Sequence, residues 1–197
     1  MNLQKRFTDE DINGVWQIIN DDLSAATSTL DYQATITIDK RDVYIDISSS
    51  AGGSLEGGYE KTVIDAPLYT RDHLRFSIHP QDFVNQIGKI FGMEDIVLGY
   101  PAFDDATIVK TNDAELVKKA FAAEWVRNAF QSLSGYTLKI EEGDKKEENH
   151  LELVIQRAIT NTAELTNLFN AFVHVLTTLD APEVSHPGAT ENNTVYA

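Results

Sequence analysis

The feature that most constrains the fold is a long amphipathic segment near the C-terminus, residues 161–179. Its apolar side chains recur at the three- and four-residue spacing of an α-helix and cover one broad face. Such a face is stable only when it packs against another layer, so the rest of the chain must supply a sheet. The apolar residues of this helix are Leu165, Leu168, Phe169, Phe172, Val173, Leu176 and Leu179.

Segments in which apolar and polar side chains alternate provide that sheet, because successive residues of a strand face opposite sides. The first four such segments follow one another with short links, which implies an antiparallel meander of four strands. The last two flank a charged loop and form a late hairpin. The expected strands are 32–38, 43–47, 59–64, 74–78, 96–98, 106–110, 136–140 and 151–155.

Three further helices are expected. The first has Thr8 as its N-cap and acidic residues in its first turn, where the helix dipole favours negative charge. A short second helix covers residues 80–91, with proline in its first turn and glycine after its end. The third begins at a capping box formed by Asn112 and Glu115 and breaks near Ala122.

Together these elements predict an α+β fold. It has a mainly antiparallel sheet with an N-terminal helix, a four-strand meander, two central helices, a late hairpin and a long C-terminal helix. A chain of 197 residues can build one substantial core, so residues 1–180 are expected to form a single domain, followed by a tail at 181–197. Two sub-lobes that meet near residues 79–95 are the alternative.

Charge and composition exclude several classes of function. The chain has 16 Lys and Arg against 31 Asp and Glu, and its net charge of −15 repels nucleic acids and anionic membranes. It has no cysteine, which excludes disulfides, thiol catalysis and thiolate metal sites. No export signal or membrane span is visible in the sequence. A cytoplasmic protein that binds neither nucleic acid nor membrane is therefore expected.

The adjacent acids Asp104 and Asp105 are the first candidates for chemistry. Neighbouring side chains of a strand point to opposite faces, and in a helix they diverge by roughly 100°, so the two cannot form a carboxylate pair by themselves. The favoured interpretation is structural. Gly99 and Pro101 shape a turn, Phe103 anchors it in the core, and one of the acids accepts hydrogen bonds from nearby backbone N–H groups.

Two histidines and two tryptophans are also candidates. On one strand His73 and His79 are roughly 20 Å apart, too far to share a metal ion, and they are expected to face outward. Trp16 and Trp125 fall at apolar helical positions and are expected in the core. The sequence predicts no cofactor and no metal site. The candidate catalytic residues are Asp104, Asp105, His73 and His79.

A glycine, a short turn and Phe-Asp ahead of a strand and an acidic helix start occur at Gly99, Phe103, Asp104, Ile108 and Asp113. Together with the hairpin and helix that follow, this pattern resembles a family of uncharacterised bacterial α+β proteins. The resemblance covers residues 76–179 and departs from the family pattern at Pro101. It implies a bacterial origin, and since the family has no assigned activity it implies no catalytic residues.

Two functions fit these observations. The first, which we favour, is a non-enzymatic protein-interaction or chaperone-like adaptor, whose sheet or amphipathic helices bind a partner protein or a second copy of the chain. The second is a small-molecule-binding protein or a hydrolase with a pocket between the sheet and the C-terminal helix. The four candidate catalytic residues would then lie at the mouth of that pocket.

Overall fold

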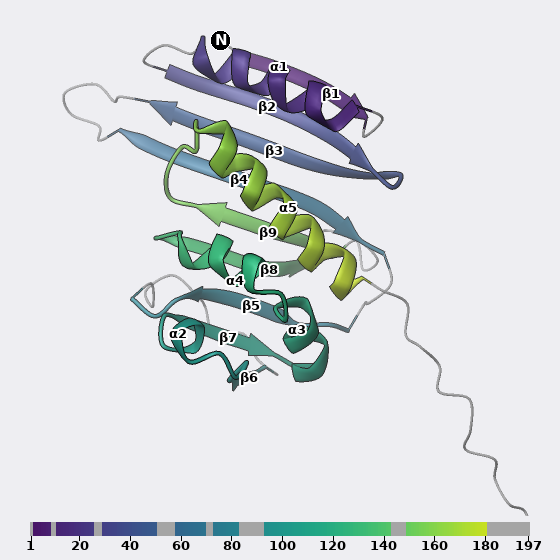
Figure 1. The fold of residues 1–197 in the computed structure, drawn as a ribbon, viewed down its shortest axis with the longest axis vertical. Coiled ribbons are helices and arrows are strands. Elements are labelled where there is room, and N and C mark those ends of the chain that lie inside the picture. Colours follow the sequence, from purple (N-terminus) through teal and green to yellow (C-terminus); the bar gives the residue numbers. More distant parts are fainter. Residues whose placement is uncertain are drawn as a thin grey trace, which may run out of the picture.

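The protein forms two layers, a single mixed sheet and a set of helices that cover one of its faces (Figure 1). This arrangement, taken from a computed structural model, confirms the α+β class, the mainly antiparallel sheet and the long C-terminal helix. The expected tail and, apart from residues 80–82, the expected helix over residues 80–91 lie outside the described residues. The structure describes residues 2–8, 11–25, 29–50, 58–69, 73–82, 93–142 and 149–180.

The elements are labelled in chain order. The helices are α1 (Ile12–Ser24), α2 (Pro101–Asp104), α3 (Ala114–Ala120), α4 (Glu124–Gln131) and α5 (Thr162–Leu179). The strands are β1 (Asn2–Thr8), β2 (Thr29–Ile38), β3 (Arg41–Ser50), β4 (Tyr59–Leu68), β5 (Phe76–Pro80), β6 (Glu94–Ile96), β7 (Thr107–Thr111), β8 (Tyr136–Glu142) and β9 (Asn149–Ile155).

The strand order of the sheet is β1-β2-β3-β4-β9-β8-β5-β7-β6. Every neighbouring pair is antiparallel except β1 and β2, which are parallel. The two expected hairpins, β2-β3 and β8-β9, are confirmed. The β2-β3 turn is closed by Asp39 and Lys40, whose φ angles of 50° and 66° are those of a tight two-residue hairpin loop.

The expected four-strand meander is wrong in its last strand. Strands β2, β3 and β4 follow one another in the sheet, but β4 pairs with β9, and β5 lies beyond β8. The β4-β9 ladder joins seven residues of each strand, Thr62–Leu68 of β4 among them, and is longer than any ladder that the five residues of β5 could form. The late hairpin therefore inserts between two segments that are consecutive in the sequence.

Two expected helix starts are also wrong. Thr8 ends the edge strand β1, and Asp11 caps α1 by accepting a hydrogen bond from the Gly14 N–H at 3.0 Å. Asp113, not Asn112, caps α3, with its carboxylate 3.1 Å from the Leu116 nitrogen. In both helices the capping aspartate directly precedes the first helical residue, so its carboxylate can reach the free N–H groups of the first turn.

Two further positions differ from the expected helices. The Asn112 side chain binds the backbone before β5 instead, accepting from the Arg75 N–H at 2.8 Å and donating to the His73 carbonyl at 2.7 Å. Pro80 is the last residue of β5, not the first turn of a helix. The expected break near Ala122 is confirmed by the separate helices α3 and α4.

The core lies between the helices and the sheet. The apolar face of α5 is buried against the sheet, and Trp16 of α1 meets the α5 residue Phe169 edge to face at 5.2 Å between ring centroids. Beside them, Phe76, Phe103 and Phe121 join the sheet to α2 and the end of α3 at centroid distances of 5.7 to 6.0 Å. The helices are therefore held in fixed positions on one face of the sheet.

Candidate functional site

The turn at Gly99 has the expected structural role. The Asp104 carboxylate accepts hydrogen bonds from the backbone nitrogens of Leu98, Gly99 and Tyr100 at 2.9, 2.9 and 2.7 Å. Gly99 has a φ of +93°, which favours glycine, and Phe103 is buried beneath the turn. Both oxygens of the Asp104 carboxylate therefore accept hydrogen bonds from the backbone. Its neighbour Asp105 is exposed just after α2.

The two candidate histidines lie in different environments. His73 is exposed before β5, as expected, whereas His79 is only 3% exposed and its Nδ1 lies 2.9 Å from the Pro80 carbonyl oxygen. The expectation that His79 faces outward is wrong, because all five residues of β5 are buried and both faces of this strand are therefore covered. Neither histidine lines the groove that follows.

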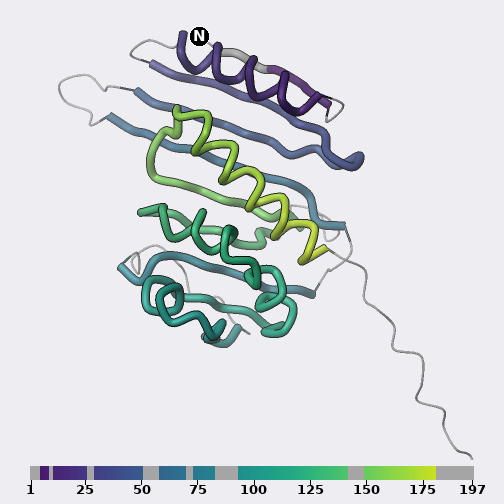
Figure 2. The backbone as a smooth tube through the Cα atoms, in the orientation of Figure 1, coloured from purple at the N-terminus to yellow at the C-terminus, as the bar shows by residue number. Residues whose placement is uncertain are grey.

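A groove of about 860 Å³ lies between α4 and α5 on the helical side of the molecule. The two helices run side by side in opposite directions, as the trace in Figure 2 shows. On the α4 side the groove is lined by Trp125, Asn128, Ala129, Ser132 and Leu133. On the α5 side it is lined by Ala163, Glu164, Asn167, Leu168 and Asn170.

Local interactions hold α4 in the position that forms this groove. The Arg127 guanidinium donates to the carbonyl oxygens of Phe121 and Ala122 at 2.6 and 2.7 Å, so it caps the end of α3 and directs the chain into α4. The same guanidinium lies over the Tyr100 ring, 3.5 Å from its centroid. The buried Phe130 then fixes the inner face of α4 against Phe121.

The groove has an apolar base and polar walls. Leu133 and Leu168 are buried at its base. Above them stand the exposed side chains of Asn128, Asn167 and Asn170. Within the described ranges, none of these three amides makes a hydrogen bond to another protein group. Their donors and acceptors are free to bind a ligand.

One end of the groove is formed by Trp125. Its side chain is 50% exposed, and its ring lies 5.3 Å from that of His174 in a T-shaped contact. The expectation that Trp125 is in the core is wrong, because Val126 and Phe130 form the buried face of α4 and the residue before Val126 is turned about 100° away from it. Trp16, by contrast, packs against the core as expected.

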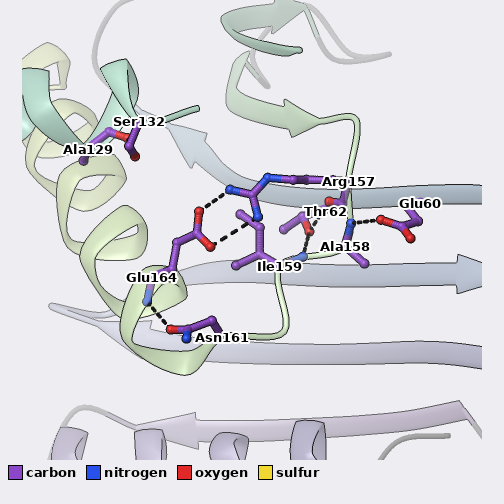
Figure 3. Close-up of polar contacts among 9 residues, drawn as sticks. All are labelled: Glu60, Thr62, Ala129, Ser132, Arg157, Ala158, Ile159, Asn161 and Glu164. Atoms are coloured by element: carbon purple, nitrogen blue, oxygen red, sulfur yellow. Dashed lines mark hydrogen bonds and ion pairs between the residues drawn. The ribbon is translucent and has the colours of Figure 1, made fainter. Parts of the chain in front are cut away.

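The other end of the groove contains an ion pair (Figure 3). The Glu164 carboxylate accepts from both terminal nitrogens of Arg157, one of them at 3.2 Å. The hydrogen bond to Glu164 raises the pKa of Arg157 above its ordinary value, which keeps the guanidinium charged. Glu164 is the one charged residue among those that line the groove, and this pairing neutralises it.

Hydrogen bonds to β4 fix Arg157 and the start of α5. The Thr62 hydroxyl donates to the Arg157 carbonyl and accepts from the Ile159 N–H, both at 2.9 Å. Asn161 caps α5 by accepting from the Glu164 N–H at 3.0 Å (Figure 3). The position of the ion pair is therefore set by the connection between β9 and α5, not by the two side chains alone.

Two smaller hollows lie elsewhere on the molecule. Between the β2-β3 hairpin and α5 there is a space of about 50 Å³ near Arg41, which is large enough for one or two water molecules. On the sheet face opposite the helices, a shallow hollow of about 220 Å³ lies beside Tyr44 and Asp65. The Asp65 carboxylate there is 2.8 Å from Nδ1 of His150. Neither hollow is as large as the groove between α4 and α5.

Comparisons with known proteins do not add a functional assignment. No protein-family model, curated protein or solved structure matches this chain significantly. Within the described ranges no group of three or more histidine, aspartate or glutamate side chains is arranged to hold a metal ion. In the same part of the chain, no helix has both the length and the apolar character needed to span a membrane.

Proposed function

We propose that the protein is a non-enzymatic interaction protein that binds a segment of a partner protein in the groove between α4 and α5. The observation that carries this proposal is the combination of three unused amides with a half-exposed tryptophan over an apolar base. Binding surfaces commonly have such an apolar centre with a polar surround, and tryptophan is enriched among residues that contribute most of the binding energy.

The chemistry of the groove supports binding over hydrolysis. Its one hydroxyl group, on Ser132, donates to the Ala129 carbonyl at 2.8 Å and has no base beside it among the groove residues. Its one carboxylate, on Glu164, is paired with Arg157. A hydrolase needs a nucleophile or water next to a base of suitable pKa, and the groove residues offer neither.

The remaining properties of the proposal follow from charge. A net charge of −15 disfavours binding to nucleic acids and anionic membranes, so the proposed partner is a protein. The proposed location is the cytoplasm, with which a chain free of cysteine is compatible. The alternative was a small-molecule-binding protein or hydrolase with a pocket between the sheet and the C-terminal helix. The space near Arg41, between the β2-β3 hairpin and α5, has a volume of only about 50 Å³. That alternative is less well supported than the groove.

A peptide selection with matched variants tests this proposal. Random peptides would be displayed and selected on the full-length protein, and the enriched peptides titrated against Ala163→Tyr, which fills the groove. Ala102→Tyr is the control, because Ala102 is also an exposed helical alanine but lies on α2, outside the groove. We expect affinity for Ala163→Tyr to fall about tenfold or more, and affinity for Ala102→Tyr to be unchanged.

Either of two results would contradict the proposal. Enriched peptides that bind Ala163→Tyr as tightly as the unmodified protein would place the binding site elsewhere. A selection that yields no specific peptide at all would argue against a peptide-binding groove. Circular dichroism of both variants would establish that each retains the fold.

A further inference from the structure

The walls of the groove present primary amides from two sides. Asn167 and Asn170 come from α5, and Asn128 comes from α4 on the opposite side. A carboxamide has two N–H donors and one carbonyl acceptor, so it can donate to a C=O and accept from an N–H at the same time. The backbone of a peptide offers this same pair of groups at each residue other than proline.

The secondary structure of a bound segment decides whether such amides can be used. In an extended chain, successive residues direct their N–H and C=O groups to opposite sides, so amides on both walls would each find a partner. In a helix the backbone N–H and C=O groups bond to one another. A bound helix would therefore offer these asparagine amides no backbone partners. Asn128 on one wall and Asn167 on the other therefore favour an extended occupant.

The groove also limits the length of the segment. From Ala163 to Asn170 the groove follows α5 over eight residues, and the seven steps between them span roughly 10 Å at about 1.5 Å each. An extended peptide advances about 3.3 Å per residue, so about three residues fit between the ends of the groove. A side chain at one end of this segment can then pack on the exposed part of Trp125.

The charge of the groove selects against charged residues in this segment. The sole charged side chain in its lining, Glu164, is neutralised by Arg157. A charged residue of the ligand would lose hydration over the buried Leu133 and Leu168 without gaining an ionic partner. An uncharged segment loses the least hydration free energy when it enters the groove.

We infer that the segment bound in the groove is an extended, uncharged stretch of about three residues, and that Asn128, Asn167 and Asn170 recognise its backbone. This inference rests on the proposed function and names its ligand class. Because backbone groups are common to all sequences, any uncharged side chain is accepted along the segment, and a preference for particular side chains arises only at the position next to Trp125.

A minimal probe tests the inference directly. N-acetyl-trialanine N-methylamide is uncharged and offers backbone groups with minimal side chains, and its backbone N-methylated analogue lacks the N–H donors. Titrations would be followed by ¹⁵N NMR of the side-chain amides of Asn128, Asn167 and Asn170. The indole N–H of Trp125 reports the end of the groove, and the core residue Trp16 provides an internal control.

We expect the unmethylated probe to shift the three amide signals and the Trp125 indole, and not the Trp16 indole. The methylated analogue should bind about tenfold more weakly, because the asparagine carbonyls lose their donors. Asn167→Ala should weaken the unmethylated probe by about fivefold or more. Asn13→Ala should not, because Asn13 is an exposed helical asparagine on α1, outside the groove. Alanine favours helix at both positions, so neither variant should unfold the protein.

The outcomes separate this inference from the proposed function. Equal binding of the two probes, or an Asn167→Ala variant that binds as well as the unmodified protein, would overturn backbone recognition. Absence of groove shifts with the unmethylated probe would also overturn it, whereas the proposed function would stand as long as selected peptides bind the groove. Absence of groove shifts together with a failed selection would overturn both.

Discussion

Replacement of Asp104 by asparagine is a sharp test of the turn before α2. The carboxylate accepts three backbone hydrogen bonds, at 2.9 Å from Leu98, 2.9 Å from Gly99 and 2.7 Å from Tyr100. Hydrogen bonds to a charged group contribute about 1.5–3 kcal/mol each. Asparagine retains one acceptor oxygen but turns an NH₂ group toward a backbone donor, so part of this sum is lost. We expect the free energy of unfolding to fall by about 2–4 kcal/mol.

Urea unfolding followed by tryptophan fluorescence and circular dichroism would measure this change. For a chain of this length the expected loss corresponds to a decrease in Tm of roughly 4–16 °C. Asp105→Asn is the matched control, because Asp105 is the next residue, carries the same charge and is exposed. Its effect should be within about 0.5 kcal/mol of zero. Equal stabilities of the two variants would refute the role assigned to the Asp104 carboxylate.

Three further predictions concern buried polar groups. Tyr136→Phe should raise the free energy of unfolding by about 1 kcal/mol, because within the described part of the chain the buried hydroxyl has no hydrogen-bond partner. A loss of stability in urea unfolding would instead reveal a partner for that hydroxyl. Burial raises the pKa of Tyr136 above its ordinary value, and burial together with the nearby negative charge of Asp22 raises the pKa of Tyr32. The folded protein therefore keeps both protons above pH 10 while the unfolded chain loses them, so stability should fall as pH rises from about 10. The slope should approach about 1.4 kcal/mol per pH unit for each tyrosine and be roughly half as steep in Tyr136→Phe, as measured by urea unfolding between about pH 9 and 11. Asp180→Asn should cost about 3 kcal/mol, because it leaves the Arg41 guanidinium, whose side chain is only 19% exposed, without its charged partner. A thermal unfolding curve within a degree of the unmodified protein would contradict that estimate.

Several features of the fold could be predicted because local patterns determine them. Alternation of apolar and polar residues located β2, β3, β8 and β9, and the apolar stripe located α5. The turn that Asp104 closes could be predicted from glycine, proline and an acid within a few residues. In each case the stabilising contacts join residues close in the sequence, so the sequence pattern contains most of the information.

The edge strand β1 could not be predicted in this way. Its seven residues do not alternate clearly between apolar and polar side chains, and it forms only by pairing in parallel with β2 across the intervening helix α1. His79 was misplaced for a related reason. In a strand with an alternating pattern, the polar residues are exposed only if no other part of the protein covers their face. Both faces of β5 are covered.

The candidate site depended most on tertiary structure. A sequence signal for it exists, since Trp125, Asn128 and Ser132 share one face of α4 and Asn167 and Asn170 share one face of α5. Each set by itself resembles an ordinary solvated helix face, however, and nothing in either helix indicates that the other lies beside it.

The sequence alone therefore determined the α+β class, most of the local elements other than β1, the acidic charge and the turn before α2. Tertiary structure decided the strand order, the burial of His79 and the groove between α4 and α5. The physical reason is that hydrogen-bonding caps, turns and hydrophobic periodicity act over a few residues. Which strands pair and which helix faces meet depends on the lengths of segments far apart in the chain and on how they pack together.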